Sequence, residues 1–279
     1  MDRRTFLKAV TIGAVGSLAL PHSAFALDDF GSQPSNEPAN VKDYLSKIKF
    51  FDHHFPDDIR LTTEQMATLA AVVARLKRVE TAVGYANFSL LSFDDAVRVG
   101  TRSSRVGEFT PQEKEFIDQT FNRSAGEYGF FGEKVLAELT TRIPSSEMIK
   151  MPATGQYLYK SDSRALYEKI VKDVGPSIVL TSGVRGIVKQ LYLFLAKANQ
   201  SEGNLSMASR SLAPPGHSFH GVGDFDVGRR GFGSRNFTEA FAKTNEFKRL
   251  TDLGYIHIRY HESNEFGVRF EPWHVKVVA

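Results

Sequence analysis

PPGHSFHGVGDFDVG, residues 214–228, is the segment from which the architecture of this chain is most directly inferred. It contains two histidines and two aspartates among four glycines. Because glycine adopts backbone conformations that other residues avoid, the glycines at positions 221 and 223 let the chain turn tightly between His220 and Asp226. An imidazole nitrogen and a carboxylate oxygen that converge in this way are typical zinc ligands. The segment therefore predicts two ligands of one metal site.

A second motif, EPWH at residues 271–274, carries the only tryptophan and a third candidate ligand, His274. Two histidines and one aspartate fill three positions of a tetrahedral zinc ion and leave the fourth to water, as catalytic sites do. A hydrolase also needs a general base, for which Glu271 is the candidate. Because Pro272 disfavours a regular strand, we expect Glu271 to end a turn and His274 to open the last strand. The chain has no cysteine, so His, Asp and Glu side chains must hold any metal.

The first half of the chain has the pattern of helices. Apolar residues recur at steps of three and four along residues 62–82, as on one face of an amphipathic helix. TPQE at residues 110–113 places a capping threonine, a first-turn proline and a glutamate where another helix would begin. The buried face of that helix would carry Phe116, Ile117 and Phe121.

The second half mixes helices with short β-branched runs. We expect helices over 164–174, 187–198 and 241–253, and strands over 178–181, 256–260, 267–270 and 274–278. Residues 201–236 are rich in glycine, serine, proline and arginine, and indicate one long functional loop. The predicted fold class is therefore α+β: a helical N-terminal region followed by a small antiparallel sheet with flanking helices that holds a zinc site.

The N-terminus has the features of a targeting segment. DRRTFLK at residues 2–8 precedes a weakly apolar stretch, 9–20, that is too short to span a bilayer, and AFA at 24–26 offers a cleavage site. The arginine pair and its neighbours resemble a twin-arginine signal, which implies export of the folded protein to the periplasm or cell-wall space. A general secretory signal is the alternative. Either one, cleaved after residue 26, leaves no stable membrane insertion.

Composition limits the classes of partner. Apolar residues make up 42% and charged residues 24% of the 279-residue chain, as in ordinary globular proteins. The net charge of +3 makes no case for nucleic acid as a partner. We divide the chain into a signal peptide (1–26), a helical region of unknown role (27–150) and a catalytic part (151–279).

Taken together, the motifs resemble the VanY-type D-alanyl-D-alanine carboxypeptidases, which are grouped with the lysostaphin-like peptidases and the hedgehog zinc fold. The segments that carry the resemblance are TSGVR (181–185) with Gln190, SFHGVG (218–223), DVG (226–228), residues 247–255 and EPWH (271–274). The resemblance spans roughly residues 156–279 and does not include 27–150.

The resemblance implies one Zn²⁺ ion bound by His220, Asp226 and His274. It also implies that Glu271 is the general base, which would take a proton from zinc-bound water and pass it to the leaving amine. A zinc ion lowers the pKa of its bound water from about 15.7 towards 7, which supplies a nucleophile at neutral pH.

By the same resemblance, Arg185 would contact the substrate and stabilise the developing oxyanion, and Gln190 and Ser218 would assist in substrate binding. A guanidinium can grip a terminal carboxylate through two hydrogen bonds, which would favour cleavage at a chain end. Val184 stands where the family usually has an aromatic residue, so the substrate side of the site differs.

One departure leaves the carboxylate ligand open. The family usually places its aspartate seven residues after the first histidine, whereas Asp226 is six residues after His220. Asp224 lies seven residues after His217, so a shifted pairing is an alternative. We favour His220 with Asp226, because the residues that flank both of them fit the family pattern.

The resemblance implies a zinc metallopeptidase that hydrolyses peptidoglycan stem peptides, releasing a C-terminal D-alanine. An L,D-carboxypeptidase or a murein endopeptidase of the same fold would share every metal residue and is the first alternative. A non-catalytic wall-binding module with a structural zinc is the second. The presence of Glu271 and Arg185 argues against that module, since a closed structural site needs neither residue.

Overall fold

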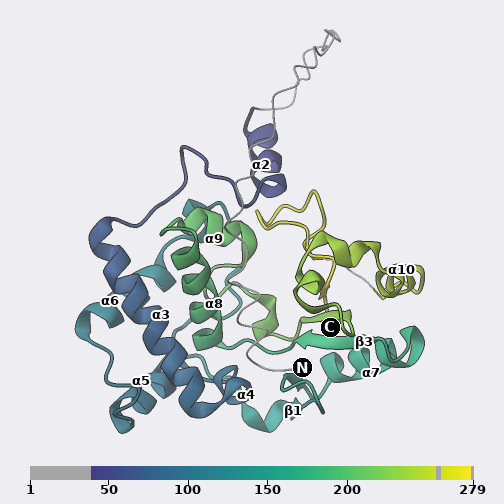
Figure 1. Cartoon of the computed structure of the whole chain (residues 1–279), viewed down its shortest axis with the longest axis horizontal. Helices are drawn as coiled ribbons and strands as arrows, with labels where there is room; N and C mark the ends of the chain where they lie inside the picture. The colour runs from purple at the N-terminus through teal and green to yellow at the C-terminus, as the bar shows by residue number, and fades with distance from the viewer. Residues whose placement is uncertain (1–38, 256–258, 278–279) are drawn as a thin grey trace.

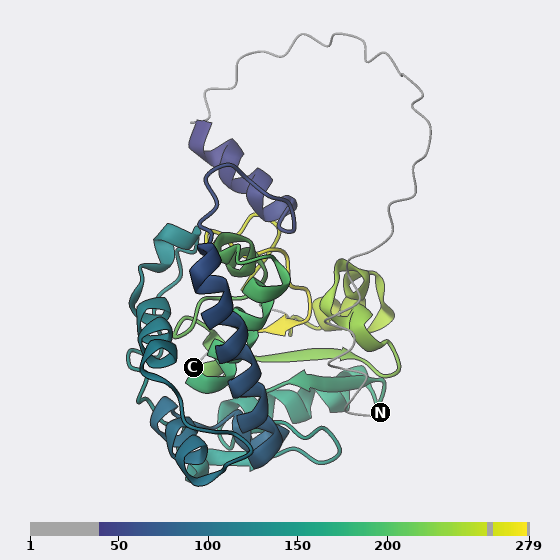
Figure 2. The same cartoon turned by 60° about the vertical axis from the view of Figure 1, so that its left-hand side comes forward.

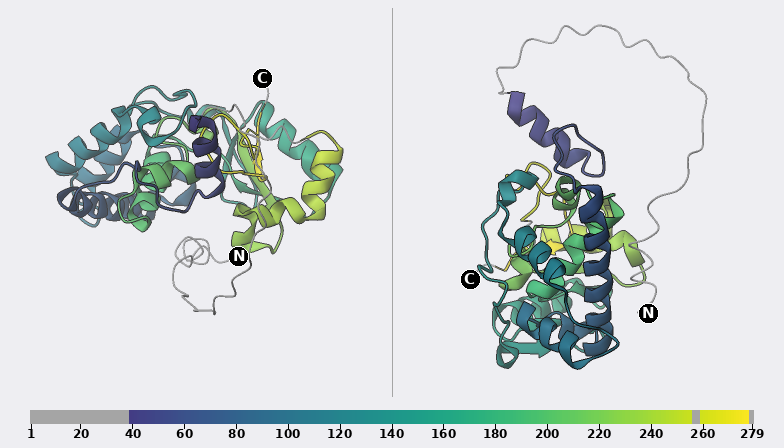
Figure 3. Two further views of the ribbon diagram at one scale, coloured as in Figure 1. Left: turned by 90° about the horizontal axis from the view of Figure 1, so that it is seen from above. Right: turned by 90° about the vertical axis from the view of Figure 1, so that its left-hand side faces the viewer.

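The computed structural model describes residues 39–255 and 259–277 (Figure 1). The predicted signal peptide, residues 1–26, and the start of the predicted strand 256–260 lie outside the described residues. Within the described part, a helical region and a smaller region built on a sheet lie side by side (Figures 1 and 3). None of the helices in this part is both long and apolar enough to cross a membrane.

The helical region contains α2 (Ala39–Lys49), α3 (Thr63–Val83), α4 (Tyr85–Phe88), α5 (Phe93–Arg102) and α6 (Pro111–Asn122). The predicted starts of α3 and α6 are confirmed. Thr62 and Thr110 each accept a hydrogen bond from the backbone three residues on, and Gln65 and Glu113 complete the two capping boxes. Such caps satisfy amide groups that a helix start otherwise leaves unpaired.

The core of the helical region includes helices from both halves of the sequence. The long helix α3 packs against α8 (Ile187–Gln200) and α6, and Figure 2 shows it running along the length of the region. α9 (Leu205–Ser211) also contributes side chains to this core. The side chains that α3 and α6 bury in it are Leu69, Val72, Leu76, Val79, Phe116, Ile117 and Phe121. This core therefore extends past residue 150, where the sequence suggested that the catalytic part begins.

The second region is built on a three-stranded antiparallel sheet in the order β3 (Ile178–Ser182), β4 (Phe225–Arg229), β5 (His274–Val275). α7 (Asp162–Val174) and α10 (Asn245–Asp252) share its apolar core with β3, β4 and β5. A separate hairpin pairs β1 (Met148–Lys150) with β2 (Tyr157–Tyr159). The predicted α+β class, with helices beside a small antiparallel sheet, is confirmed.

The prediction of one long loop over residues 201–236 is wrong in part, because this stretch contains α9 and the central strand β4. α9 is rich in serine, which has a modest helix propensity, but all seven of its residues are buried, and tertiary packing outweighs propensity. Gly228 lies inside β4, and a glycine in that position made the strand hard to predict from the sequence. A side chain at Gly228 would collide with Asn236. The Asn236 side-chain amide accepts a hydrogen bond from the backbone N–H of Arg229 and donates one to its carbonyl oxygen.

Two other element predictions need correction. Residues 267–270 form no strand, because the backbone here bonds outside the sheet: Phe266 accepts from Phe131, and Arg269 donates to Arg210. The helix predicted over 241–253 begins only at Asn245, because the Thr244 side chain caps it there.

Candidate metal centre

The central strand β4 places Asp226 between two other parts of the candidate site. Asp226 is the register partner of Ser182 on β3 and of His274 on β5. Directly opposed residues of antiparallel strands present their side chains on the same face of the sheet. Phe225 and Val227, the neighbours of Asp226, point into the apolar core of the sheet, so the carboxylate faces the other way.

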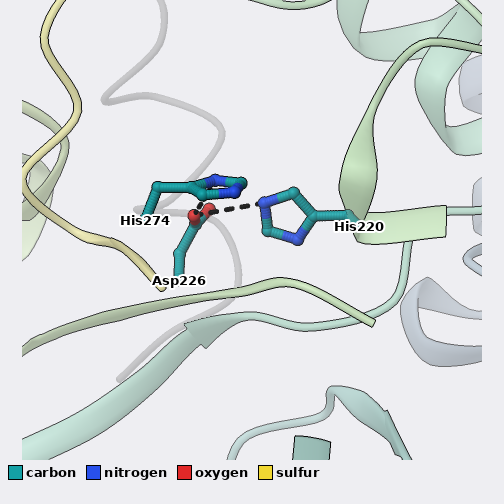
Figure 4. A group of neighbouring side chains, drawn as sticks. All are labelled: His220, Asp226 and His274. Carbon is teal, nitrogen blue, oxygen red and sulfur yellow. Dashed lines mark hydrogen bonds and ion pairs between the residues drawn. The ribbon is translucent and has the colours of Figure 1, made fainter. Parts of the chain in front are cut away.

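His220 reaches the same point from the 3-10 turn η3 (Phe219–Gly221), and Figure 4 shows its ring facing Asp226 and His274. Nε2 of His220 lies 3.1 Å from Oδ1 of Asp226, and Nδ1 of His274 lies 3.3 Å from that same oxygen. One potential ligand atom from each residue lies within 4.8 Å of the other two, and all three residues are buried. Of the described residues, these three form the group that could hold a metal ion.

The far nitrogen of each histidine ring has a fixed partner. Nδ1 of His220 donates to the carbonyl oxygen of Gly183 at 2.8 Å, which leaves Nε2 as the lone-pair nitrogen. Nε2 of His274 donates to Asp224 at 2.9 Å, so Nδ1 is the nitrogen that carries the lone pair when the ring is neutral. Nδ1 of His274 is buried without a hydrogen-bond partner. Two imidazole nitrogens and a carboxylate oxygen directed at one point fit a zinc ion.

Asp224, the alternative carboxylate ligand, is engaged behind His274. Its Oδ2 accepts from Nε of Arg259 at 2.7 Å as well as from His274, and its Oδ1 accepts from the backbone of Val277 at 2.9 Å. His217 lies against another segment, because its Nδ1 is 3.1 Å from the carbonyl oxygen of Gly132. The structure therefore places the side chains of the shifted pair outside the convergent group.

The sequence of residues 160–279 matches the VanY family of D-alanyl-D-alanine carboxypeptidases. These residues form a VanY-type domain. The predicted enzyme class, a peptidase of the D-alanyl-D-alanine carboxypeptidase type, is confirmed for this domain. The helical region before residue 160 lies outside the match.

Three solved structures are similar to this chain at low identity. The LdcB LD-carboxypeptidase shares 22% identity over 48% of this chain and 69% of its own, with a TM-score of 0.41. A mutant of the vancomycin resistance D,D-pentapeptidase VanY, in complex with Zn(II), shares 22% identity. The match covers 49% of this chain and 83% of the other, with a TM-score of 0.37. VanYB in complex with D-alanine-D-alanine shares 24% identity. The match covers 49% of this chain and 81% of the other, also with a TM-score of 0.37. No curated protein matches the chain.

Charges in the VanY-type domain favour an ionised Asp226. Burial alone would raise the pKa of this carboxyl, but His220 and Arg185 outweigh burial and hold its pKa far below the ordinary range. Burial, helped by Arg185, lowers the pKa of His220 to about 4, so this ring is neutral at physiological pH. A deprotonated aspartate and a neutral histidine are the forms that bind a metal.

His274 and Asp224 behave as a coupled pair. Burial would lower the pKa of His274, but the carboxylates of Asp224 and Asp226 raise it to about 9. Burial likewise opposes ionisation of Asp224, yet His274 and Arg259 lower its pKa to about 2. A metal ion must therefore displace a proton from His274 at neutral pH.

Glu271 lies beside the convergent group as a candidate base. It begins the turn that leads to His274, rather than ending a turn as expected, and its Oε2 lies 3.9 Å from Nδ1 of His274. Its backbone N–H donates to the carbonyl of Tyr260. Burial raises the pKa of Glu271 to about 7, although His274 and Arg269 act in the opposite direction. A carboxyl with a pKa near the working pH is suited to general acid–base catalysis.

The predicted substrate residues border the site, but the side chain of Gln190 is held by backbone groups. Arg185 forms an ion pair with Asp226, donates from Nε to Ser182 at 2.9 Å, and keeps a side-chain exposure of 15%. The Gln190 amide donates to the carbonyl of Arg185 at 2.7 Å and accepts from the backbone of Gly216 at 2.8 Å. The backbone N–H of Ser218 lies 3.4 Å from the same amide oxygen. Direct substrate contact by Gln190 and Ser218 stays a prediction.

Sequence reasoning did not identify the groups that orient the two histidine rings, and it named Asp224 only as an alternative ligand. Asp224 and Arg259 hold His274 in place, and the carbonyl of Gly183 holds His220. The Asp-x-Asp spacing was the one signal for Asp224, whereas a backbone carbonyl leaves no signal in a sequence. Val184, which was expected to reshape the substrate side, is buried in an apolar cluster with Ile143 and Met148.

Proposed function

We propose that this protein is a zinc-dependent D,D-carboxypeptidase that releases the C-terminal D-alanine of peptidoglycan stem peptides. One observation carries the proposal: the buried carboxyl of Glu271 lies 3.9 Å from Nδ1 of His274, beside the convergent group that could hold a metal ion, in a VanY-type domain. A closed structural metal site has no use for such a group. The proposed location is the periplasm or cell-wall space, in line with the export signal expected over residues 1–26.

His220, Asp226 and His274 would hold the ion through Nε2, a carboxylate oxygen and Nδ1. When bound, zinc supplies Lewis-acid chemistry, polarising the scissile carbonyl and lowering the pKa of water. Asp224 and the carbonyl of Gly183 would keep the two rings in the orientation that presents the correct nitrogens.

Glu271 would carry out the proton transfers of this hydrolysis. Its carboxylate accepts a proton from the attacking water as the oxygen of that water bonds to the carbonyl carbon. It then donates the proton to the nitrogen of the departing amino acid as the C–N bond breaks. Burial, which raises the pKa of this carboxyl to about 7 in the absence of metal, favours a group that can both take up and return a proton.

Arg185 would select a chain end. Its guanidinium borders the ligand group, and its five N–H donors exceed what its contacts with Asp226 and Ser182 require. A guanidinium binds the planar carboxylate of a C-terminus through paired hydrogen bonds. This preference would distinguish a carboxypeptidase from an endopeptidase, whose substrates offer no carboxylate at that position.

The test is digestion of three defined muropeptides by the purified protein: a pentapeptide ending in D-Ala-D-Ala, a tetrapeptide and a cross-linked dimer. We expect mass analysis to show loss of one D-alanine from the pentapeptide alone, with the loss abolished by a chelator and restored by Zn²⁺. Loss of D-alanine from the tetrapeptide would indicate an L,D-carboxypeptidase, and cleavage of the dimer would indicate an endopeptidase. Bound zinc without any product would indicate a non-catalytic wall-binding module.

A further inference from the structure

The helical region before the VanY-type domain touches the loops of the metal centre at three places. The first contact is a chain of hydrogen bonds that ends on a ligand. The hydroxyl of Tyr85, on α4, accepts from the side-chain amide of Gln156 at 3.1 Å. The amide oxygen of Gln156 accepts a hydrogen bond from the backbone N–H of Gly183 at 3.3 Å. The carbonyl oxygen of Gly183 in turn accepts one from Nδ1 of His220 at 2.8 Å. Gln156 is buried, so its partners cannot be replaced easily by water.

Gln156 is the branch point of this chain. Its amide nitrogen also donates to the carbonyl of Thr181 at 3.2 Å, so one side chain holds the segment 181–183 at two backbone groups. A side chain at Gly183 would collide with the carbonyl of Tyr157. The segment is therefore packed tightly against the strand that follows Gln156, and the direction of the Gly183 carbonyl depends on that packing.

The second contact fixes the turn after Arg185. The backbone N–H of Gly186 donates to the carbonyl of Ser89, next to α4, at 2.8 Å. A Cβ atom at Gly186 would come within 2.9 Å of that carbonyl oxygen and 3.3 Å of the carbonyl oxygen of Leu91. Because these atoms are backbone groups that yield little, the loop that carries Arg185 is seated directly on the helical region.

The third contact fixes the loop that leads to His220. The backbone N–H of Leu136 donates to the carbonyl of Gly216 at 2.9 Å. The His217 ring lies 3.1 Å from the carbonyl of Gly132 and is stacked edge-on to Phe130. A buried histidine two residues before the metal-binding turn thus binds the helical region rather than the metal.

We propose that the helical region is an internal brace of the metal centre, in which Tyr85 and Gln156 are positioning residues for the ligand His220. This inference rests on the proposed zinc site, and it gives the region a role that needs no partner outside the chain. Without the brace, the Gly183 carbonyl would be free to turn, and the His220 ring would lose the hydrogen bond that selects its lone-pair nitrogen.

The test measures the affinity of the full mature chain for Zn²⁺ by competition with a chromophoric chelator. We expect Gln156→Met, which removes three hydrogen bonds, to weaken zinc binding about tenfold, the lower end for loss of outer partners. Tyr85→Phe, which removes one hydroxyl, should weaken it about threefold, in keeping with one hydrogen bond. The milder variant also covers the case in which Gln156→Met fails to fold.

Tyr157→Phe is the matched control. It removes a tyrosine hydroxyl from the same interface, where that hydroxyl donates to the side chain of Asn87 at 3.4 Å, and it leaves the Tyr157 carbonyl that packs against Gly183 in place. Its zinc affinity should equal that of the wild type, and thermal melting without zinc should be recorded for all variants.

Unchanged affinity in Tyr85→Phe and Gln156→Met, with or without a lower melting temperature, would overturn the brace and leave the proposed function intact. An equal loss of affinity in Tyr157→Phe and Tyr85→Phe would overturn it too, because the effect would then be general loosening of the interface. A wild-type protein that binds no zinc would instead overturn the proposed function, and the brace with it.

Discussion

Nε2 of His274 donates a hydrogen bond to Oδ2 of Asp224 at 2.9 Å, while Nδ1 of the same ring lies 3.3 Å from Asp226. One ring therefore contacts two carboxylates that are two residues apart in the sequence. Asp226 belongs to the convergent ligand group, and Asp224 decides which nitrogen of His274 is free to join it.

Replacing Asp224 by asparagine should weaken zinc binding about 10- to 100-fold, because an amide lacks the charge that holds the His274 N–H. Chelator competition measures the affinity, and ¹⁵N NMR of the zinc-bound protein reports which ring nitrogen of His274 still carries a proton. Asp95→Asn is a suitable control, since it removes an ion-paired carboxylate at the start of α5, far along the chain from the ligands. Wild-type affinity in Asp224→Asn would contradict the positioning role.

Replacing Glu271 by alanine should lower kcat by about 10²–10⁴-fold, the usual contribution of a general base. Zinc content should stay at one ion per chain, because Glu271 is not in the convergent group. D-alanine release and metal analysis of the same preparation make the comparison, with the exposed Glu265→Ala as the control. Release at a near wild-type rate would remove Glu271 from the mechanism.

Zinc affinity should rise with pH between about 6 and 8. In the absence of zinc the pKa of His274 is raised to about 9, so below that pH the ring carries a proton that zinc must displace. The expected slope is about tenfold per pH unit for one displaced proton, and it should flatten above the pKa. The pKa of His220, lowered to about 4, adds no slope in this range. An affinity independent of pH, measured with a chelator of known proton affinity, would contradict this charge assignment.

Replacing Arg185 by lysine keeps a positive charge but removes the planar fork that matches a carboxylate. We expect KM for a peptide with a free C-terminus to rise about tenfold, with a smaller change in kcat. A peptide with an amidated C-terminus should be a poor substrate for the wild type and should not distinguish the two proteins. Equal cleavage of the free and amidated peptides by the wild type would show that Arg185 does not select a chain end.

The sequence predicted that His220, Asp226 and His274 converge, because short motifs carry these residues. His220 and Asp226 lie in one segment with tight glycine turns, and the EPWH motif supplies both a base and a ligand. Which carboxylate joins the group was harder to predict, since Asp224 and Asp226 are two residues apart and side chains at that spacing point to the same side of an extended chain. The pairing of β4 with β5 places Asp226 opposite His274, and spacing alone does not reveal this register.

The parts of the fold that were missed depend on contacts distant in sequence. The strand β4 contains Gly228, which is tolerated because Asn236 packs against it. Residues 267–270 alternate like a strand, but their backbone partners lie in the helical region. The brace from Tyr85 to Gly183 joins segments about a hundred residues apart, and no local pattern records it.

The most direct test of the account is a crystal structure of the protein with Zn²⁺, with diffraction recorded on both sides of the zinc absorption edge. We predict one anomalous peak, which marks a zinc ion bound by Nε2 of His220, Nδ1 of His274 and a carboxylate oxygen of Asp226. Nε2 of His274 should still donate its hydrogen bond to Asp224. A peak held by Asp224 and His217, or no peak between residues 220 and 274, would contradict it.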